Sequence, residues 1–221
     1  AKEERFPKAF RLMKMWSWWL ALAAGIVVKK VKETPLPNDT PYVVCCNHAS
    51  YLDIVLMYRV FSDYFVMMGK GEIENWRFFR VFFLSGMNIL VHRENNKKAH
   101  ESLQKAKEKL SKGQNVVIFP EGGIYPHAPV IKGLKNGAFK LAIEQQVPIV
   151  PMTFETNWRL LNGTQFFKGS VGPGICKVHI HKAISTKGLT DADIPELKKM
   201  VKDAMEEPLL KHYASIEKER G

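Results

Sequence analysis

The stretch "YVVCCNHASYLD", residues 42 to 53, predicts a buried strand that ends in a turn and leads into a helix. Its first five residues are apolar or small, which is the pattern of a strand buried on both faces. His48 and Asp53 follow, five positions apart, at the point where the strand should end. The junction therefore joins a core strand to two side chains that can carry out proton chemistry.

Further apolar runs alternate with amphipathic stretches along the chain. The expected strands are Tyr42–Cys46, Tyr64–Met68, Asn88–Val91, Asn115–Phe119, Ile149–Phe154 and Cys176–His181. The expected helices cover 51–61, 73–84, 96–112, 136–146 and 192–213. This alternation predicts an α/β fold, with a mostly parallel sheet flanked by helices. In the last helix Pro208 should cause a kink or an interruption, because proline lacks the N–H donor of a helical residue.

The N-terminal segment "MWSWWLALAAGIVV", residues 15 to 28, is apolar and lies between lysines. It is shorter than the roughly 20 residues that a membrane-spanning helix needs. Lys29 and Lys30 follow it directly, without a small-residue cleavage site, which argues against a cleaved signal peptide. Tryptophans beside lysines suit the headgroup boundary, so we expect an amphipathic helix that lies on the bilayer. A helix packed on the domain core is the alternative.

A linker is expected at "KETPLPNDTP", residues 32 to 41, because its three prolines disfavour regular structure. The linker divides the chain into two parts. Residues 1–34 are expected to form an N-terminal helical, membrane-associated element, and residues 35–221 an α/β domain.

The chain is strongly basic: 33 lysines and arginines against 22 aspartates and glutamates give a net charge of +11 over 221 residues. This excess predicts an anionic partner, which could be nucleic acid, anionic lipid or an acidic carrier protein. The basic residues are spread along the chain, without a zinc spacing, a helix-turn-helix or an aromatic RNA-binding signature. We therefore expect no nucleic-acid partner.

The cysteines and histidines do not follow a metal-binding pattern. The chain has three cysteines, an odd number without ligand spacing. We interpret Cys45 and Cys46 as small core residues in a reducing compartment. The pair His179-x-His181 is explained equally well by alternation along a strand. We expect no metal ion.

Three polar clusters follow expected strands: "NHASYLD" after the first, "HRENN" after the third and "PEGGIYPH" after the fourth. In open α/β sheets, ligands bind at the carboxyl ends of the strands. The three clusters come from distant segments and should meet at that edge. They predict a functional site there.

His48 and Asp53 allow two interpretations. If a helix begins near Tyr51, Ser50 is its N-cap and Asp53 occupies the capping-box position three residues later. Alternatively, the turn folds back so that the carboxylate orients one imidazole nitrogen and leaves the other free. A histidine oriented in this way is a general base. The spacing alone leaves both interpretations open.

Other side chains near the expected edge have similar alternatives. In "FPEGG", residues 119 to 123, the glycines let the backbone approach a ligand, and Glu121 is either a ligand contact or a turn residue. Lys135 precedes a helix whose N-terminus favours anions, or is simply solvated. Arg93 could bind phosphate in bidentate fashion, or be an exposed surface residue.

Four short blocks, taken in their order along the chain, resemble the glycerolipid acyltransferases, typified by 1-acylglycerol-3-phosphate O-acyltransferase. The resemblance covers about residues 42 to 154 and includes "KNGAFKLA". The N-terminal helical element and the basic surface also look like the bacterial members. The four blocks that carry it are Asn47-His48-x4-Asp53, Gly86 with a strand ending in Arg93, Phe119-Pro120-Glu121-Gly122, and "VPIVP" at 147 to 151.

The resemblance implies a mechanism and roles for individual residues. His48 would be the general base that takes the proton from the acceptor hydroxyl, and Asp53 would orient it. The oxygen would attack an acyl thioester directly, without a covalent acyl-enzyme. The residues that would bind the glycerol-phosphate part of the acceptor are Asn47, Arg93, Glu121, Gly122 and Lys135.

The resemblance also implies partners and a location. The acyl donor would be acyl-coenzyme A or acyl carrier protein, which is acidic and suits the basic surface; no cofactor is implied. The substrates would meet at the inner face of the cytoplasmic membrane, with the chain attached as a peripheral or monotopic protein.

The chain departs from the family pattern at two places. After Phe-Pro-Glu-Gly the family commonly continues Thr-Arg-Ser, whereas this chain has Gly123-Ile124-Tyr125, and His92 replaces a frequent Asp before Arg93. The arginine that would contact phosphate is missing. The acceptor is then 1-acyl-glycerol-3-phosphate, which gives phosphatidic acid, or another lysolipid such as a singly acylated aminolipid. A non-catalytic lipid-binding protein would be expected to lose His48 or Asp53, and both are present.

Overall fold

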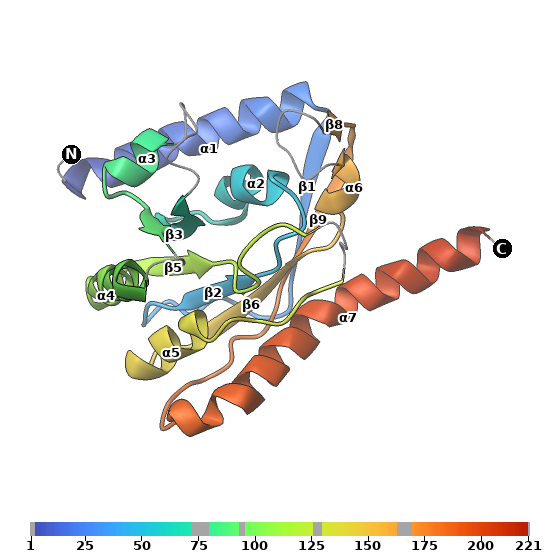
Figure 1. The fold of residues 1–221 in the computed structure, drawn as a ribbon. Helices are drawn as coiled ribbons and strands as arrows, with labels where there is room; N and C mark the ends of the chain where they lie inside the picture. Colours follow the sequence, from blue (N-terminus) through green and yellow to red (C-terminus); the bar gives the residue numbers. More distant parts are fainter. Residues whose placement is uncertain (1–2, 72–79, 93–95, 126–129, 163–168, 221) are drawn as a thin grey trace.

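A seven-stranded sheet forms the centre of the molecule (Figure 1). A computed structural model describes residues 3–71, 80–92, 96–125, 130–162 and 169–220. The strand order in the sheet is β1-β9-β6-β2-β5-β3-β4, and β7 pairs separately with β8. The strands are β1 Ile26–Lys32, β2 Val43–Cys46, β3 Phe65–Lys70, β4 Ile89–Val91, β5 Asn115–Ile118, β6 Ile149–Phe154, β7 Leu161–Asn162, β8 Ser170–Val171 and β9 Gly174–Ile180.

Most strand pairs in the sheet are parallel, which confirms the predicted α/β architecture. β2 pairs in parallel with both β5 and β6, and β3 pairs in parallel with β5 and β4. The exception is the antiparallel pair of β6 and β9, so that β9 and its parallel neighbour β1 run opposite to the others. The carboxyl ends of β2, β5 and β6 consequently lie next to one another.

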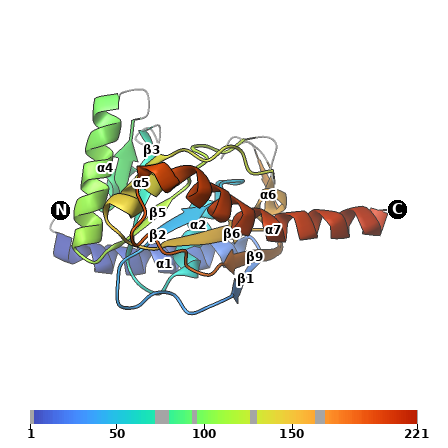
Figure 2. The ribbon, with the colours of Figure 1, turned by 90° about the horizontal axis from the view of Figure 1, so that it is seen from below.

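Helices cover both faces of the sheet (Figure 1). α1 and α2 lie over one face, and α5 and α7 over the other, as the view turned by 90° also shows (Figure 2). Each face has its own apolar core. The helices are α1 Phe6–Ala23, α2 Leu52–Val60, α3 Arg80–Leu84, α4 Asn96–Ser111, α5 Gly137–Glu144, α6 Asn157–Leu160 and α7 Ile194–Arg220, with short 3-10 turns η1 Glu3–Arg5 and η3 Asp191–Asp193.

α1 packs one face against the sheet layer and leaves the other to solvent. Its buried residues recur every three or four positions, which is the spacing of one helix face: Phe6, Phe10, Met13, Ser17 and Ala21. The Ser17 hydroxyl donates to the Val55 carbonyl of α2 at 2.7 Å. Within the described ranges, no helix has both the length and the apolar character needed to cross a bilayer.

The N-terminal helical element expected over residues 1–34 also contains a strand in its last third. α1 ends at Ala23, Gly25 takes a left-handed conformation with φ of 66°, and β1 begins at Ile26. β1 is an edge strand paired with β9, so the sheet includes residues on the N-terminal side of the expected boundary. The cause is local: β-branched Ile26, Val27 and Val28 continue the apolar run but favour a strand over a helix.

α7 continues through Pro208 without interruption. The missing N–H of Pro208 leaves the helical carbonyl of Ala204 without its usual donor. One residue further on, the Thr153 hydroxyl of β6 donates to the carbonyl of Met205 at 2.9 Å, which ties this part of the helix to the sheet. The C-terminal turns of α7 then extend beyond the body of the molecule (Figures 1 and 2).

Candidate active site

His48 and Asp53 form a hydrogen-bonded pair at the carboxyl end of β2. Nδ1 of His48 lies 3.0 Å from Oδ2 of Asp53. The Asp53 side chain is fully buried, whereas 11% of the His48 side chain is exposed. Because a carboxylate can only accept, Nδ1 carries the shared proton and Nε2 keeps its lone pair. This arrangement leaves Nε2 as the basic atom of the pair.

Asp53 also stabilises the turn that leads into α2. The residue directly before the helix is Tyr51 and not the expected Ser50, and its side chain makes no capping hydrogen bond. Oδ2 of Asp53 accepts hydrogen bonds from the backbone N–H groups of Ala49 at 2.8 Å and Ser50 at 2.9 Å. The Ser50 hydroxyl in turn accepts from the N–H of Leu52 at 3.3 Å. The turn around 48–53 therefore folds back on the carboxylate and holds the imidazole beside it.

Asn157 completes the surroundings of Asp53 and was not foreseen from the sequence. Its Nδ2 donates to Oδ1 of Asp53 at 2.8 Å, and its side chain is fully buried. The opposite amide orientation would set an oxygen against a carboxylate, so the network fixes the amide. Asn157 lies shortly after β6, at the same sheet edge as His48. Because ligands bind at the carboxyl ends of parallel strands, the polar residues after β6 could have been named as candidate site residues for that reason alone.

The turn that carries Asn157 is anchored to β9. The N–H of Glu155 donates to the Lys177 carbonyl at 2.9 Å. Thr156 donates through its hydroxyl to the Ile175 carbonyl at 2.7 Å and accepts from the N–H of Lys177 at 2.9 Å. Asn157 thus projects from a fixed backbone toward Asp53.

Asn47, expected as a substrate contact, is buried and bonded to β6. Its Nδ2 donates to the Phe154 carbonyl at 3.1 Å, and its Oδ1 accepts from the Phe154 N–H at 2.8 Å. The side chain therefore links β2 to β6 directly before His48. A contact between Asn47 and substrate stays a prediction.

Glu121 joins three segments of the site. Its Oε1 accepts from the N–H of His48 at 2.8 Å, and its Oε2 accepts from the N–H of Lys132 at 3.0 Å. Burial raises the pKa of the Glu121 carboxyl, although both backbone hydrogen bonds act in the opposite direction. Gly122 follows with φ of 90°, in the left-handed region that favours glycine.

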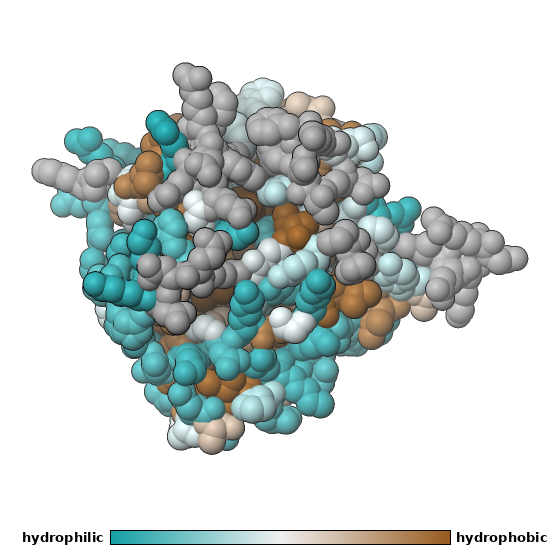
Figure 3. Space-filling model, in the orientation of Figure 1, coloured by the Kyte–Doolittle hydropathy of each residue, from teal (hydrophilic) through white to brown (hydrophobic). Residues whose placement is uncertain are grey.

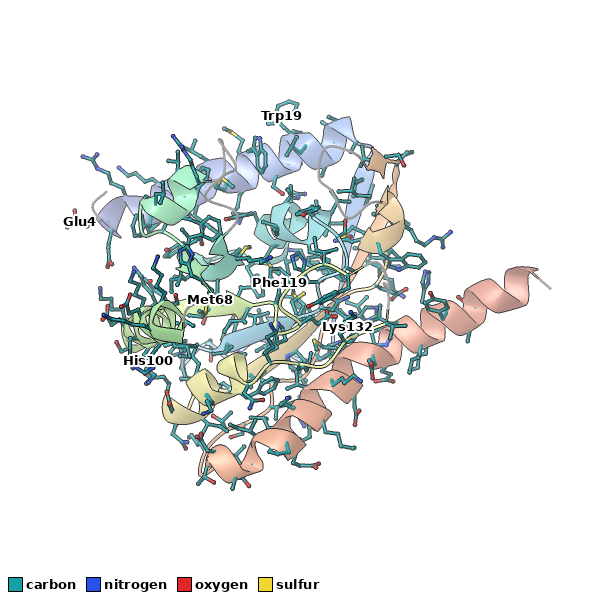
Figure 4. All side chains as sticks on the ribbon, in the orientation of Figure 1. Glu4, Trp19, Met68, His100, Phe119 and Lys132 are labelled. Carbon is teal, nitrogen blue, oxygen red and sulfur yellow. The ribbon has the colours of Figure 1, made fainter. Side chains whose placement is uncertain are left out.

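The ring of His48 is held from one side by Phe119. The two rings are stacked, with centroids 4.2 Å apart and an angle of 24° between their planes. Phe119 is at the centre of the view with side chains (Figure 4). The imidazole is held in one orientation because the carboxylate of Asp53 bonds its edge and the ring of Phe119 packs on its face.

Of the two basic residues expected to bind phosphate, Lys135 lies within the described residues and Arg93 does not. Lys135 is exposed, and its backbone N–H donates to the Pro120 carbonyl at 2.9 Å, which places it beside the segment after β5. Arg93 lies outside the described residues, so its role stays a prediction. The preceding residue, His92, lies close to Gly71, directly after β3. A Cβ added at Gly71 would lie 2.6 Å from Nδ1 of His92.

A small pocket opens beside His48. It is lined by Asn47, His48, Ala49, Glu121, Tyr125, Val130 and Ile131. The ammonium group of Lys132 lies 3.9 Å from the centroid of the Tyr125 ring. Neither Tyr125 nor Lys132 was foreseen as a functional residue. Within the described part of the chain, no group of His, Cys, Asp and Glu side chains is arranged to hold a metal ion.

The profile of the acyltransferase family matches residues 27–155, more than half of the chain. The chain belongs to the acyltransferase family. It is 30% identical over 192 residues to 1-acyl-sn-glycerol-3-phosphate acyltransferase of Saccharomyces cerevisiae, covering 86% of this chain and 62% of the yeast protein. It is also 30% identical to the alpha form from Mus musculus, covering 82% of this chain and 63% of the mouse protein. The chain thus spans about three fifths of the length of these curated relatives.

A solved structure shares the fold. The crystal structure of the 1-acyl-sn-glycerophosphate (LPA) acyltransferase PlsC from Thermotoga maritima superposes with a TM-score of 0.66. The alignment covers 97% of this chain and 83% of that one, at 22% sequence identity. At this identity the likeness establishes the α/β architecture.

Proposed function

We propose that the chain transfers a fatty acyl group from a thioester to the free hydroxyl of 1-acyl-glycerol-3-phosphate, giving phosphatidic acid. The acceptor hydroxyl gives its proton to Nε2 of His48, and its oxygen forms a bond to the thioester carbonyl carbon. The tetrahedral intermediate then collapses, the C–S bond breaks, and the leaving thiolate takes the proton from Nε2. The hydrogen bond from Nδ1 to Asp53, 3.0 Å long, is the observation that carries the proposal.

Asp53 holds the imidazole in the tautomer that this reaction requires. A proton on Nδ1 leaves Nε2 ready to accept another, and the carboxylate stabilises the imidazolium that forms. Asn157 and the backbone of Ala49 and Ser50 keep the carboxylate in place.

Direct transfer, without a covalent acyl-enzyme, is supported by the state of the neighbouring thiol. Cys46 is fully buried among core residues. Burial raises the pKa of its thiol well above the ordinary value, and the nearby carboxylates of Asp53 and Glu121 act in the same direction. A thiol in this environment is a poor nucleophile.

The acceptor can be tested with purified enzyme, a fatty acyl thioester and two lysolipids offered together. One is 1-acyl-glycerol-3-phosphate and the other is a lyso-aminolipid with a free hydroxyl. Mass spectrometry of the products should give phosphatidic acid as the main product. The sequence Gly123-Ile124 in place of Thr-Arg favours the second acceptor as the alternative. A product from the lyso-aminolipid alone would replace the proposed acceptor, and acyl transfer to neither would reject the activity.

The donor in this proposal is a phosphopantetheine thioester, either acyl-coenzyme A or acyl carrier protein. Both are anionic, which suits the net charge of +11. Initial rates with each donor, measured at low and high salt, will distinguish them. A rate with carrier protein that falls steeply with added salt would indicate a charged docking surface.

We further propose that α1 lies on an anionic membrane surface. Its outward face is apolar: Leu12, Met15, Trp19 and Leu22 are each more than half exposed, and Trp19 points away from the sheet (Figure 4). From Arg5 to Lys32 the sequence contains basic residues and no aspartate or glutamate. By contrast, hydrophilic side chains predominate over α4 on the face in Figure 3.

Such a helix can pack on the domain and contact lipid at the same time, because its two faces differ. Attachment would be peripheral or monotopic, at the inner face of the cytoplasmic membrane, where soluble thioester donors are found. Flotation with vesicles containing anionic lipid tests this placement. The variant Leu12→Glu/Trp19→Glu should stay in the soluble fraction, whereas the control Leu210→Glu on α7, also exposed, should float like the original chain. Equal flotation of both variants would contradict the placement.

A further inference from the structure

A cation that does not come from the expected positions lies against a side chain that lines the pocket beside His48. Tyr125 lines this pocket together with His48 and Glu121. The ammonium group of Lys132 lies over the Tyr125 ring, 3.9 Å from its centroid. An ammonium over an aromatic face is attracted by the ring quadrupole, so the ring of Tyr125 holds this charge. Lys132 lies on the segment between β5 and α5 (Figure 4).

The position of Lys132 relative to the base is set by Glu121. One carboxylate oxygen accepts from the N–H of His48, and the other accepts from the N–H of Lys132. A single buried side chain therefore fixes the backbone of the base and the backbone of the lysine to each other. Both carboxylate oxygens accept from backbone amides, and these donors stabilise the negative charge that Glu121 brings to the lining of the pocket.

The chemistry of the acceptor requires a positive charge near the catalytic base. In a glycerol phosphate, neighbouring carbons carry the reacting hydroxyl and the phosphate ester, so the phosphate must bind beside the catalytic base. The family that the chain resembles commonly has an arginine at the position of Ile124, which cannot bind an anion. Lys132 is the cation that the described residues place against the side chain next to Ile124.

We infer that Lys132, held by the ring of Tyr125, binds the phosphomonoester of the acceptor and replaces the missing arginine. This inference rests on the proposed acyl transfer, and names the residue that recognises the head group. Lysine binds phosphate as a point charge, whereas arginine binds it through a planar fork. The subsite should therefore select for negative charge and depend on salt more than on head-group shape.

The kinetic test compares two acceptors that differ in the phosphate only: 1-acyl-glycerol-3-phosphate and 1-acylglycerol with the same acyl chain. Lys132→Gln should raise KM for the phosphate-bearing acceptor about tenfold and change kcat by less than about twofold. The rate with 1-acylglycerol should stay the same. The matched control is Lys140→Gln, which removes an exposed lysine of α5 that pairs with Asp191 at 3.6 Å. This variant should leave both acceptors unaffected.

Tyr125 gives a second, independent variant pair. Tyr125→Phe keeps the aromatic face and should keep the KM of the original chain. Tyr125→Leu removes the ring, so the ammonium is no longer held, and KM for the phosphate-bearing acceptor should rise severalfold. A rise of KM to the same extent in both variants would show that the hydroxyl, and not the ring face, is what matters, and would overturn this part of the inference.

A binding test separates the subsite from the reaction. An amine-reactive ester labels the exposed lysines, and mass spectrometry follows the modification of Lys132 and Lys140. 1-Acyl-glycerol-3-phosphate should slow the labelling of Lys132, whereas 1-acylglycerol should not, and Lys140 should be labelled equally in all samples. Protection without any turnover would reject the proposed function and keep the subsite. Equal labelling of Lys132 with both lipids, or an equal fall of kcat/KM for both acceptors in Lys132→Gln, would overturn the inference.

Discussion

Replacement of Asp53 by asparagine tests the hydrogen-bond network around the base. In the native site, Oδ2 accepts from Nδ1 of His48 and from the N–H groups of Ala49 and Ser50, while Oδ1 accepts from Nδ2 of Asn157. The amide introduced by Asp53→Asn has one oxygen and one NH2 group. With its oxygen on the side of the three donors, its NH2 group faces the NH2 group of Asn157, where the native contact is 2.8 Å.

Two quantities should change in Asp53→Asn. Loss of one buried hydrogen bond to a charged acceptor should lower the free energy of unfolding by about 1.5–3 kcal/mol. Loss of the negative charge beside the imidazole should reduce kcat on the order of 10³-fold, because the imidazolium is no longer stabilised. Urea unfolding and thiol release from the acyl donor measure the two effects separately.

The double variant Asp53→Asn/Asn157→Asp distinguishes hydrogen bonding from charge. Its carboxylate at position 157 can accept from the NH2 group introduced at position 53, so most of the lost stability should return. The charge is then on the far side of the network from His48, so kcat should remain low. Retention of more than about a tenth of kcat in the single variant, or full recovery of kcat in the double variant, would refute the role of the Asp53 charge.

Three further predictions concern the rest of the molecule. Burial lowers the pKa of His181 from its ordinary value of 6.5, and this effect exceeds the opposite effect of Glu33. The imidazole of His181 therefore binds a proton less tightly in the folded state than in the unfolded state. The free energy of unfolding should therefore fall as the pH drops below 6.5, and His181→Gln should lose less stability than the original chain when urea unfolding is compared at about pH 7.5 and 5.5. The three cysteines are buried, so a thiol reagent should label none of them in the folded protein and all of them in urea; labelling of the folded protein would contradict their place in the core. Gly122→Ala should lower the free energy of unfolding by about 1–2 kcal/mol because φ is 90° there, whereas Gly133→Ala, where a Cβ would meet open space, should have a smaller effect in the same assay.

The parallel part of the fold could be predicted because its signals are local. Runs such as Tyr42–Cys46 and Ile149–Phe154 are apolar throughout, as expected for strands covered on both faces. Turn and helix signals between them set the α/β alternation. The contact between His48 and Asp53 was foreseeable for the same reason, since both residues lie within one turn.

The features of the fold and of the site that could not be predicted depend on contacts between distant segments. β1 lies where the N-terminal helix was expected to continue. The β-branched residues there favour a strand, but the pairing with β9 that makes it part of the sheet joins segments that are distant in the sequence. Asn157 lies 104 positions from Asp53, and the sequence contains no signal for that contact beyond the edge at which β6 ends. The carboxylate of Glu121 is bonded to the backbone of His48 and Lys132, which its place in the sequence does not indicate, and its expected contact with substrate stays a prediction.

The central claim is that His48 acts as the base for acyl transfer to a lysolipid hydroxyl. The most direct measurement follows thiol release and lipid product together in His48→Ala and in the original chain, with 1-acyl-glycerol-3-phosphate as acceptor. The proposal predicts phosphatidic acid from the original chain, and a fall of both signals by at least about 10²-fold in the variant. Phosphatidic acid formed by His48→Ala at a rate near that of the original chain would contradict it.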